Sequence, residues 1–196
     1  MAGVMYSARP GETPLDDLSG LKLKIPNVTR RQLDEAEAAN IRKAISRYSG
    51  SHKVIRFDTG FFNKLHKQMF GDVWKWAGEY RTTATNIGSP PVHILQDLII
   101  LQKNLEVRPH DLETGVWLHH RAVQIHPYQG GNGRWSRFLS DLWLQRHIKQ
   151  TINWPVGMEQ ESPVREIYLT ALREADRLNY KPLVELHEKF SSAQDP

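Results

Sequence analysis

The stretch that decides the fold of this chain reads HPYQGGNGRWSR and covers residues 126–137 of 196. After Gly133, apolar residues recur every three or four positions, which predicts a helix over about residues 132–149. A Gly-Asn-Gly turn at a helix start leaves several backbone N–H groups unpaired and pointing the same way, and the helix dipole adds positive potential there. The sequence therefore predicts a phosphate-binding loop at residues 131–133.

Four side chains add chemistry to this loop. Arg134 and Arg137 are about one helical turn apart, so both guanidinium groups can converge on one polyanion. His126 ends the preceding helix and faces the loop, and an imidazole with a pKa of ~6.5 accepts protons at neutral pH. Asn132 orients a phosphate oxygen or holds the loop in shape. A plain connector does not need this combination, so we interpret the stretch as a phosphate site with His126 as general base.

Composition is typical of a globular protein with one domain: 39% of the residues are hydrophobic and 24% are charged. No run approaches the ~20 apolar residues of a membrane span, and residues 1–9 lack the pattern of a signal peptide. Because the chain has no cysteine, disulfides and cysteine-ligated zinc are excluded. We expect a cytoplasmic protein without a membrane partner.

The charge pattern argues against nucleic acid as a partner. The 26 Lys and Arg residues exceed the 22 Asp and Glu residues by only four, and this excess is spread along the chain. The nine histidines form neither an HExxH motif nor another tight ligand spacing. His119 and His120 are adjacent and diverge on a helix. We therefore expect core or surface roles for the histidines other than His126.

Helical periodicity and capping residues predict an all-α bundle with one small β-hairpin. Residues 1–28 are interpreted as an N-terminal arm and residues 29–196 as a single domain, with its core at about 57–190. The hairpin is expected at residues 80–93, where β-forming residues precede a Gly-Ser-Pro-Pro turn. The predicted helices cover about residues 30–48, 58–69, 94–107, 112–125, 132–149, 162–178 and 180–191.

Two separate blocks of the chain resemble the Fic family. The core motif of that family runs His-x-Phe-x-Asp/Glu-Gly-Asn-Gly-Arg-x-x-Arg. The chain matches it at His126, Gly131, Asn132, Gly133, Arg134 and Arg137. Residues 65–82, LHKQMFGDVWKWAGEYRT, resemble the upstream helix and the strand that leads into the family's target-binding hairpin. From about residue 57 to about residue 190, the chain is similar to the subgroup called mobile mystery protein B.

The resemblance implies a Fic-like helical bundle with protein adenylyltransferase activity, which moves AMP from ATP to a Tyr, Ser or Thr hydroxyl of a target protein. It implies that His126, Asn132 and Arg134 are catalytic and that the loop through Arg137 binds the phosphates. The target is expected to lie as an added strand along a flap. The flap residues are Thr85, Asn86, Ile87 and Gly88. A toxin-like role with an antitoxin or regulator as partner, and a homo-oligomer, also fit the resemblance.

Two positions depart from the family motif. Tyr128 replaces Phe and keeps an aromatic ring. Gly130 stands where the family has Asp or Glu, the residue that the resemblance implies would hold Mg²⁺ on the nucleotide phosphates. Mg²⁺ often keeps several waters and leans on substrate phosphates. We therefore expect ATP as the substrate, together with Mg²⁺ that lacks its usual protein ligand, and a weaker transferase.

Many Fic proteins also carry an inhibitory helix with the pattern Ser/Thr-x-x-x-Glu-Gly/Asn, whose glutamate pairs with the second arginine of the core motif. The predicted helix at 30–48 offers Glu35 and Glu37, and neither has Ser or Thr four residues earlier. Glu37 is the better match of the two. A solvated acidic face of the helix is the alternative interpretation.

Three other functions compete with AMP transfer. A nucleotide-binding Fic-like protein with weak or no transferase activity would follow from the missing carboxylate at Gly130. A Doc-like phosphotransferase is the second, because the spacing does not distinguish attack at the α-phosphate from attack at the γ-phosphate. The third is a helical nucleic-acid-binding protein that uses the GGNGR turn within a helix-turn-helix.

Overall fold

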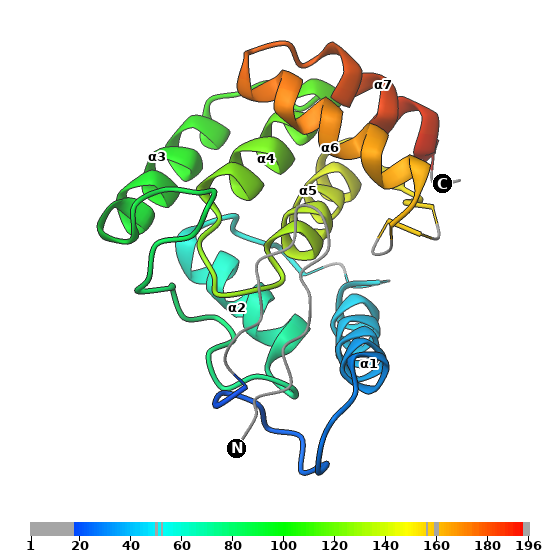
Figure 1. Ribbon diagram of the computed structural model, residues 1–196. Coiled ribbons are helices and arrows are strands. Elements are labelled where there is room, and N and C mark those ends of the chain that lie inside the picture. The colour runs from blue at the N-terminus through cyan, green and yellow to red at the C-terminus, as the bar shows by residue number, and fades with distance from the viewer. Residues whose placement is uncertain (1–17, 50, 52, 156, 159–160, 194–196) are drawn as a thin grey trace.

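The all-α class with a small antiparallel sheet is confirmed by the computed structural model (Figure 1). It describes residues 18–49, 51, 53–155, 157–158 and 161–193. Two short strands, β1 (Gln150–Ile152) and β2 (Ser191–Ala193), accompany the helices. The helices within these residues are α1 (Arg30–Tyr48), α2 (Thr59–Phe70), the 3₁₀ helix η1 (Pro91–His93), α3 (Ile94–Glu106), α4 (Leu112–Ile125), α5 (Asn132–Ile148), α6 (Pro163–Asp176) and α7 (Lys181–Phe190).

Four helices begin at a side chain that caps the first turn. Thr29, Asp58, Asp111 and Ser162 each accept a hydrogen bond from the backbone N–H three residues later. Such caps satisfy an N–H group that has no partner inside the helix. Each of these residues stands just before an apolar periodic segment, which is why the boundaries predicted for α1, α2, α4 and α6 agree closely with the structure.

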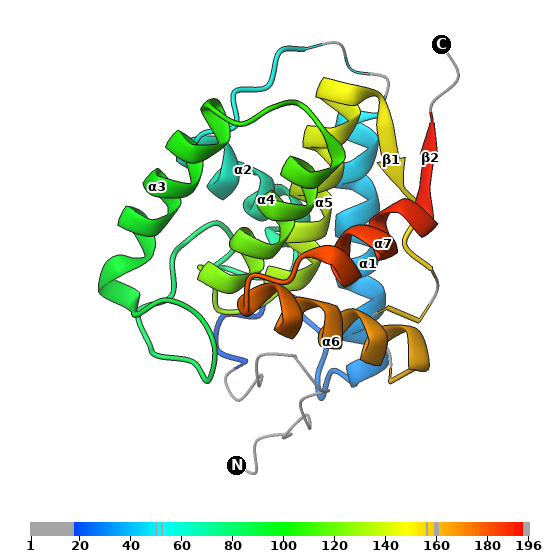
Figure 2. The same ribbon diagram turned by 90° about the horizontal axis from the view of Figure 1, so that it is seen from above.

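Helices α4 and α5 pack against each other in the middle of the molecule (Figures 1 and 2). On one side α2 contacts α5 and α1 contacts α2, while on the other side α3 covers α4. Helices α6 and α7 form a pair that lies across α4. No helix formed by the described residues is long and apolar enough to cross a membrane.

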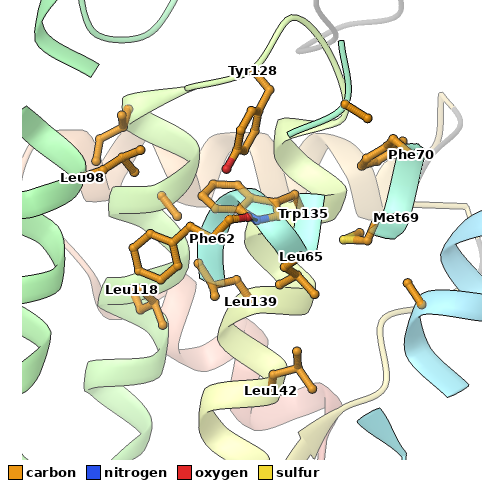
Figure 3. Close-up of a cluster of buried hydrophobic side chains, with 14 of the residues drawn as sticks. Phe62, Leu65, Met69, Phe70, Leu98, Leu118, Tyr128, Trp135, Leu139 and Leu142 are labelled. Atoms are coloured by element: carbon orange, nitrogen blue, oxygen red, sulfur yellow. Dashed lines mark hydrogen bonds between the residues drawn. The ribbon is translucent and has the colours of Figure 1, made fainter. Parts of the chain in front are cut away.

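The main core lies where α2, α4 and α5 meet, as Figure 3 shows. Trp135 of α5 is fully buried, and its Nε1 donates a hydrogen bond to the carbonyl of Phe62 in α2 at 3.2 Å. Phe62 packs edge-on against the Trp135 ring, with the ring centroids 6.2 Å apart. Because Trp135 belongs to the first turn of α5, this contact fixes the start of α5 and the loop that precedes it.

A second buried cluster joins α6 and α7 to α4. It consists of Val116, Met158, Tyr168, Ala171, Ala175, Leu183 and Leu186. The arrangement places one face of α6 opposite the start of α5, and this face forms one wall of the site described below.

The described part of the N-terminal arm packs on the domain. Leu21 forms an antiparallel bridge with Trp74, and backbone hydrogen bonds join Lys22 to Val73 and Lys75 to Gly20 at 2.8 Å each. The part of the predicted arm at residues 1–17 lies outside the described residues.

The position predicted for the β-hairpin is wrong. The antiparallel sheet pairs β1 with β2, with Thr151 opposite Ser192. Between residues 80 and 93 the structure has an isolated bridge from Tyr80 to Tyr128, bends, and η1. Arg81 explains the difference, because its guanidinium donates to the carbonyls of Thr83 and Ser89. Those two carbonyls are therefore satisfied by a side chain, and no paired strand is required.

Candidate active site

A cavity of about 430 Å³ lies at the start of α5. Its walls come from α1, from the loop at 87–88, from α4, from residues 130–134, and from α6. Its volume falls within the range of small-molecule sites, roughly 300–1,000 Å³. The cavity brings together the six residues that match the core motif: His126, Gly131, Asn132, Gly133, Arg134 and Arg137.

The loop at the start of α5 has the shape that its glycines allow. Gly131 is left-handed, with φ of 75°, and a Cβ atom there would lie 2.4 Å from the Phe70 ring. Any other residue at this position would therefore clash and be strained. Gly131 supplies no side-chain cap to α5, and residues of the first turn line the cavity, so the start of this helix is suited to bind an anion.

Asn132 holds the loop in shape. Its Oδ1 accepts a hydrogen bond from the Tyr128 N–H at 2.9 Å, and its Nδ2 donates to the Tyr128 carbonyl at 2.8 Å. The side chain is buried, with 2% of its surface exposed. Of the two roles predicted for Asn132, this geometry favours loop shaping over contact with a phosphate oxygen.

His66 is a further determinant of the loop, and sequence analysis missed it. Its Nδ1 accepts the Gly78 N–H at 2.9 Å, so the neutral ring carries its proton on Nε2 and donates to the Gly130 carbonyl at 3.0 Å. The ring stacks on Tyr128 at 3.7 Å. Complete burial lowers the pKa of His66 to about 3, which keeps the ring neutral. A histidine on the apolar face of a helix gives no sign of such partners.

The residues of this site do not fit a protein-held Mg²⁺ ion. Gly130 has no side-chain oxygen, and its carbonyl already accepts a hydrogen bond from His66. Within the described residues there is also no group of three or more His, Cys, Asp or Glu side chains arranged for a metal. The groups available for phosphates are backbone amides and arginines.

His126 ends α4 in a left-handed conformation, with φ of 52° and ψ of 57°. Its Nδ1 lies 3.3 Å from the Val123 carbonyl, which can only accept, so the neutral ring carries its proton on Nδ1 and its lone pair on Nε2. Burial, together with the charge of Arg81, lowers the pKa of His126 to about 4. The imidazole is therefore neutral over a wider pH range than the sequence-based value of ~6.5 suggests.

Arg81 connects His126 to the flap, and sequence analysis also missed this role. Its Nε donates to the His126 carbonyl at 2.7 Å, which helps to hold the left-handed backbone of that residue. The remaining guanidinium nitrogens bind the carbonyls of Thr83 and Ser89. The approach is so close that a Cβ atom at Gly88 would lie 2.7 Å from both Arg81 and His126. Arg81 is 5% exposed, as expected for a residue with an internal role.

The predicted flap residues form a loop with bends at residues 86–88, next to the cavity. Ile87 and Gly88 line the cavity, while Asn86 is exposed and Thr85 is half-buried. The Thr85 hydroxyl hydrogen-bonds to the Ile87 carbonyl. Segment 85–88 therefore borders the cavity without being a strand.

The two motif arginines lie at different depths. Arg134 is half-buried and stands 4.9 Å from the centre of the Phe70 ring. Arg137 is buried, and its guanidinium packs 5.5 Å from the Tyr168 ring and 5.9 Å from the Trp154 ring. Both line the cavity, which agrees with the predicted convergence on one ligand.

Glu37 reaches the site from α1. Its Oε2 lies 2.6 Å from Arg134 Nη1, and its Oε1 accepts a hydrogen bond from Trp74 Nε1 at 2.6 Å. Glu35, the other candidate, is exposed and lies 3.7 Å from Arg31. The structure thus separates the two candidates. Glu37 pairs with Arg134, the first arginine of the motif, whereas the resemblance implies the second.

Comparison with known proteins places the central part of the chain in a family. Residues 56–144 match the sequence model of the Fic/DOC family. The chain is 30% identical over 154 residues to "Protein adenylyltransferase VbhT" of Bartonella schoenbuchensis, in a match that covers 71% of this chain and 31% of that protein. It is 26% identical over 156 residues to "Protein adenylyltransferase fic-1" of Caenorhabditis elegans, covering 74% of this chain and 29% of that protein. The chain thus spans about a third of the length of these relatives.

A solved structure shares the fold. The BepC protein of Bartonella tribocorum, crystallised with bound AMPPNP, matches with a TM-score of 0.66 at 20% identity. The match covers 85% of this chain and 90% of that one. The family match at 56–144 includes α2, the flap and the whole motif from His126 to Arg137. The chain therefore carries a domain of the Fic/DOC family.

Proposed function

We propose that this protein transfers AMP from ATP to a hydroxyl side chain of a target protein, with His126 as general base. The observation that carries the proposal is one cavity lined by the neutral imidazole of His126, the start of α5, and Arg134 and Arg137. The relatives VbhT and fic-1 are named protein adenylyltransferases, and BepC binds AMPPNP. These likenesses support a nucleotide substrate.

In the proposed reaction, His126 Nε2 takes the proton of the incoming Tyr, Ser or Thr hydroxyl. The hydroxyl oxygen attacks the α-phosphorus, the bond from that phosphorus to the bridging oxygen breaks, and pyrophosphate leaves. The amides of the loop at 131–133 and the two arginines stabilise the negative charge on the phosphates. The chain itself supplies the proton acceptor, the backbone amides and the guanidinium groups that these steps use.

The proposed target lies along the flap at 85–88. This segment is a loop that borders the cavity and presents the exposed side chain of Ile87 next to Gly88. Backbone groups of such a segment can pair with an added strand of a target. The proposal also includes the cytoplasmic location expected from the composition, and the mobile mystery protein B subgroup suggested by residues 57–190.

We further propose that Glu37 inhibits this site. A guanidinium that is expected to bind phosphate is paired with the Glu37 carboxylate, and Trp74 holds the other oxygen of that carboxylate. A like-charged phosphate brought next to Glu37 would be repelled. A regulator or antitoxin that moves α1, or a change of oligomeric state, would relieve this inhibition.

A nucleotide-binding protein with little transferase activity is the second candidate. Two observations favour it, the missing side-chain oxygen at Gly130 and the Glu37–Arg134 pair. A Doc-like phosphotransferase would use the same base and the same loop with attack at the γ-phosphate.

Labelling with ATP that carries ³²P at the α- or the γ-position tests these functions. The wild type and the Glu37→Gly variant are incubated with each nucleotide and with candidate target proteins. AMP transfer predicts protein labelling by the α-label only, and more in Glu37→Gly than in the wild type. Labelling by the γ-label only would establish phosphoryl transfer instead. If the wild type and Glu37→Gly both bind ATP but transfer neither label to protein, the second candidate is established.

A further inference from the structure

A series of buried hydrogen bonds leads from Tyr168, beside Arg137, away from the cavity to α7. The Arg137 guanidinium packs against Tyr168 of α6, with its central carbon 5.5 Å from the centre of the ring, and the charge of Arg137 acts on the Tyr168 hydroxyl. The Tyr168 hydroxyl lies 2.9 Å from His119 Nε2, and His119 Nδ1 lies 3.1 Å from His187 Nε2. His187 Nδ1 in turn lies 2.7 Å from the carbonyl of Leu183 in the same helix. We call Tyr168, His119 and His187 the tyrosine–histidine series.

The two ends of the series fix the direction of every hydrogen bond in it. The Leu183 carbonyl only accepts, so His187 Nδ1 carries a proton and, in the neutral ring, Nε2 accepts. His119 must then donate from Nδ1 and accept at Nε2, so the Tyr168 hydroxyl donates to it. The lone pairs of the Tyr168 oxygen are then left for the nearby Arg137 guanidinium, which can only donate.

Burial keeps both histidines of the series neutral. It lowers the pKa of His187 to about 4 and the pKa of His119 well below its ordinary value. The nearby charge of Arg137 acts in the same direction on His119. The single direction of donation is therefore stable at neutral pH.

Such an arrangement has more than a packing role. Arg137 is 7% exposed, and a buried guanidinium is stable only where oxygen atoms accept its hydrogens in the correct geometry. The Tyr168 hydroxyl is itself held by His119, and His119 by His187. His119 and His187 do not line the cavity; they reach Arg137 through the hydrogen bond to Tyr168 and through ring contacts with Trp154.

We propose that the tyrosine–histidine series is a positioning network that holds the Arg137 guanidinium where it meets the phosphates of the nucleotide. The inference rests on the proposed function, because it takes the ligand to be a nucleoside triphosphate. Its three members are positioning residues, and none of them touches the reacting atoms.

The protonated nitrogens of the histidines test the geometry without any ligand. Nitrogen-15 NMR of the uniformly labelled wild-type protein distinguishes Nδ1–H from Nε2–H rings. The series requires the Nδ1–H form of both His119 and His187, and His66 provides an internal contrast because its partners require the Nε2–H form. A His119 ring protonated on Nε2 would reverse the bond to Tyr168 and overturn the proposal.

Ligand affinities test the effect on the site. The Tyr168→Phe variant removes the hydroxyl that links Arg137 to His119. Because hydrogen bonds to charged groups are stronger than those between neutral groups, we expect the Kd for a non-hydrolysable ATP analogue to rise about tenfold or more. The Kd for adenosine, which has no phosphate, should change less than about twofold. Tyr180→Phe is the matched control, because its hydroxyl lies 2.9 Å from His120 and its removal leaves the series intact. It should leave both affinities unchanged.

Each outcome has a definite meaning. If the wild type and Tyr168→Phe bind the analogue with equal affinity, the network is overturned. It is also overturned if Tyr168→Phe loses affinity for the analogue and for adenosine to the same extent, because such a loss indicates general damage to the protein. A wild-type protein that binds no ATP analogue would overturn the proposed function, and this inference with it, even if the expected histidine forms are present. Where Tyr168→Phe does not fold, the NMR measurement on the unchanged protein decides.

Discussion

Glu37 Oε2 lies 2.6 Å from Arg134 Nη1, and this ion pair joins α1 to the first turn of α5 across 97 positions of sequence. Trp74 Nε1 donates to the other carboxylate oxygen at 2.6 Å, so the carboxylate is held from two sides. Both members of the pair line the cavity. A residue of α1 therefore neutralises a charge that the phosphate loop is expected to offer to a nucleotide.

The first prediction is that Glu37→Gly increases AMP transfer by about tenfold or more, because it removes the carboxylate that competes with phosphate for Arg134. The same change removes the acceptor of Trp74 Nε1 and places a glycine inside α1, so the free energy of unfolding should fall by about 1–3 kcal/mol. Transfer is measured with α-labelled ATP and stability by urea unfolding.

Glu35→Gly is the matched control for this variant. It makes the same substitution in the same helix, at an exposed carboxylate that lies 3.7 Å from Arg31. It should reduce stability by about 1 kcal/mol and leave transfer unchanged. Equal activation by both variants would show that α1 acts through its stability and not through the ion pair.

The second prediction concerns the pH dependence of kcat/KM, which reports groups of the free enzyme. The pKa of His126 is lowered to about 4, so the base stays unprotonated as the pH falls from 8 to about 5. We expect a flat profile over that range in Glu37→Gly, with loss of activity toward pH 4. A half-maximal rate near pH ~6.5 would mean that the base is an ordinary solvated histidine. Circular dichroism at each pH establishes that the protein is still folded.

The third prediction is that the folded state loses stability in mild acid. Burial lowers the pKa to about 3 for His66 and to about 4 for His126 and His187, whereas the unfolded chain binds protons below about 6.5. The free energy of unfolding is therefore highest above pH ~6.5 and falls by about 1.4 kcal/mol per pH unit for each such histidine as the pH drops toward 4.

One carboxylate opposes this trend. Burial raises the pKa of Asp141 to about 6, so its protonation favours the folded state between about pH 6 and 4 and offsets one histidine. Urea unfolding from pH 7.5 to 4.5 measures the sum. Stability that is unchanged or higher at pH 4.5 would contradict the buried, neutral state of the three histidines.

Much of this fold could be predicted from local sequence. Capping residues such as Thr29 and Asp111 and the spacing of apolar residues determine the helices, because these signals act within one or two turns. The shape of the loop at residues 131–133 also depends on local signals, since Gly131 must be left-handed and Asn132 binds the backbone only four residues away.

The remaining features of the site depend on contacts between distant residues. The His66–Gly130 bond spans 64 positions and the Arg81–His126 bond spans 45, and nothing in the local sequence marks either side chain. The hairpin expected at 80–93 was wrong for the same reason. β-propensity does not reveal that Arg81 takes up the carbonyls of Thr83 and Ser89.

The fourth prediction is that Gly130→Asp keeps the fold and makes transfer more dependent on Mg²⁺. Gly130 does not have a left-handed φ, and a Cβ atom there would lie 3.2 Å from the Trp76 ring, so a shift of a few tenths of an ångström suffices. The new carboxylate would add a metal ligand beside the phosphate loop. Transfer is measured against Mg²⁺ concentration, with Gly130→Asn as the control of similar size without charge. An identical Mg²⁺ dependence in both variants would contradict the prediction.

The most direct test of the central claim compares Glu37→Gly with the double variant Glu37→Gly/His126→Ala. Loss of a general base lowers catalysis by roughly 10²–10⁴-fold. The account predicts that the double variant loses AMP transfer by at least about a hundredfold. Its Kd for a non-hydrolysable ATP analogue should stay within about threefold, because the imidazole handles a proton and does not hold the phosphates. Transfer that persists in the double variant, or affinity that falls as far as activity, would contradict His126 as the general base of this site.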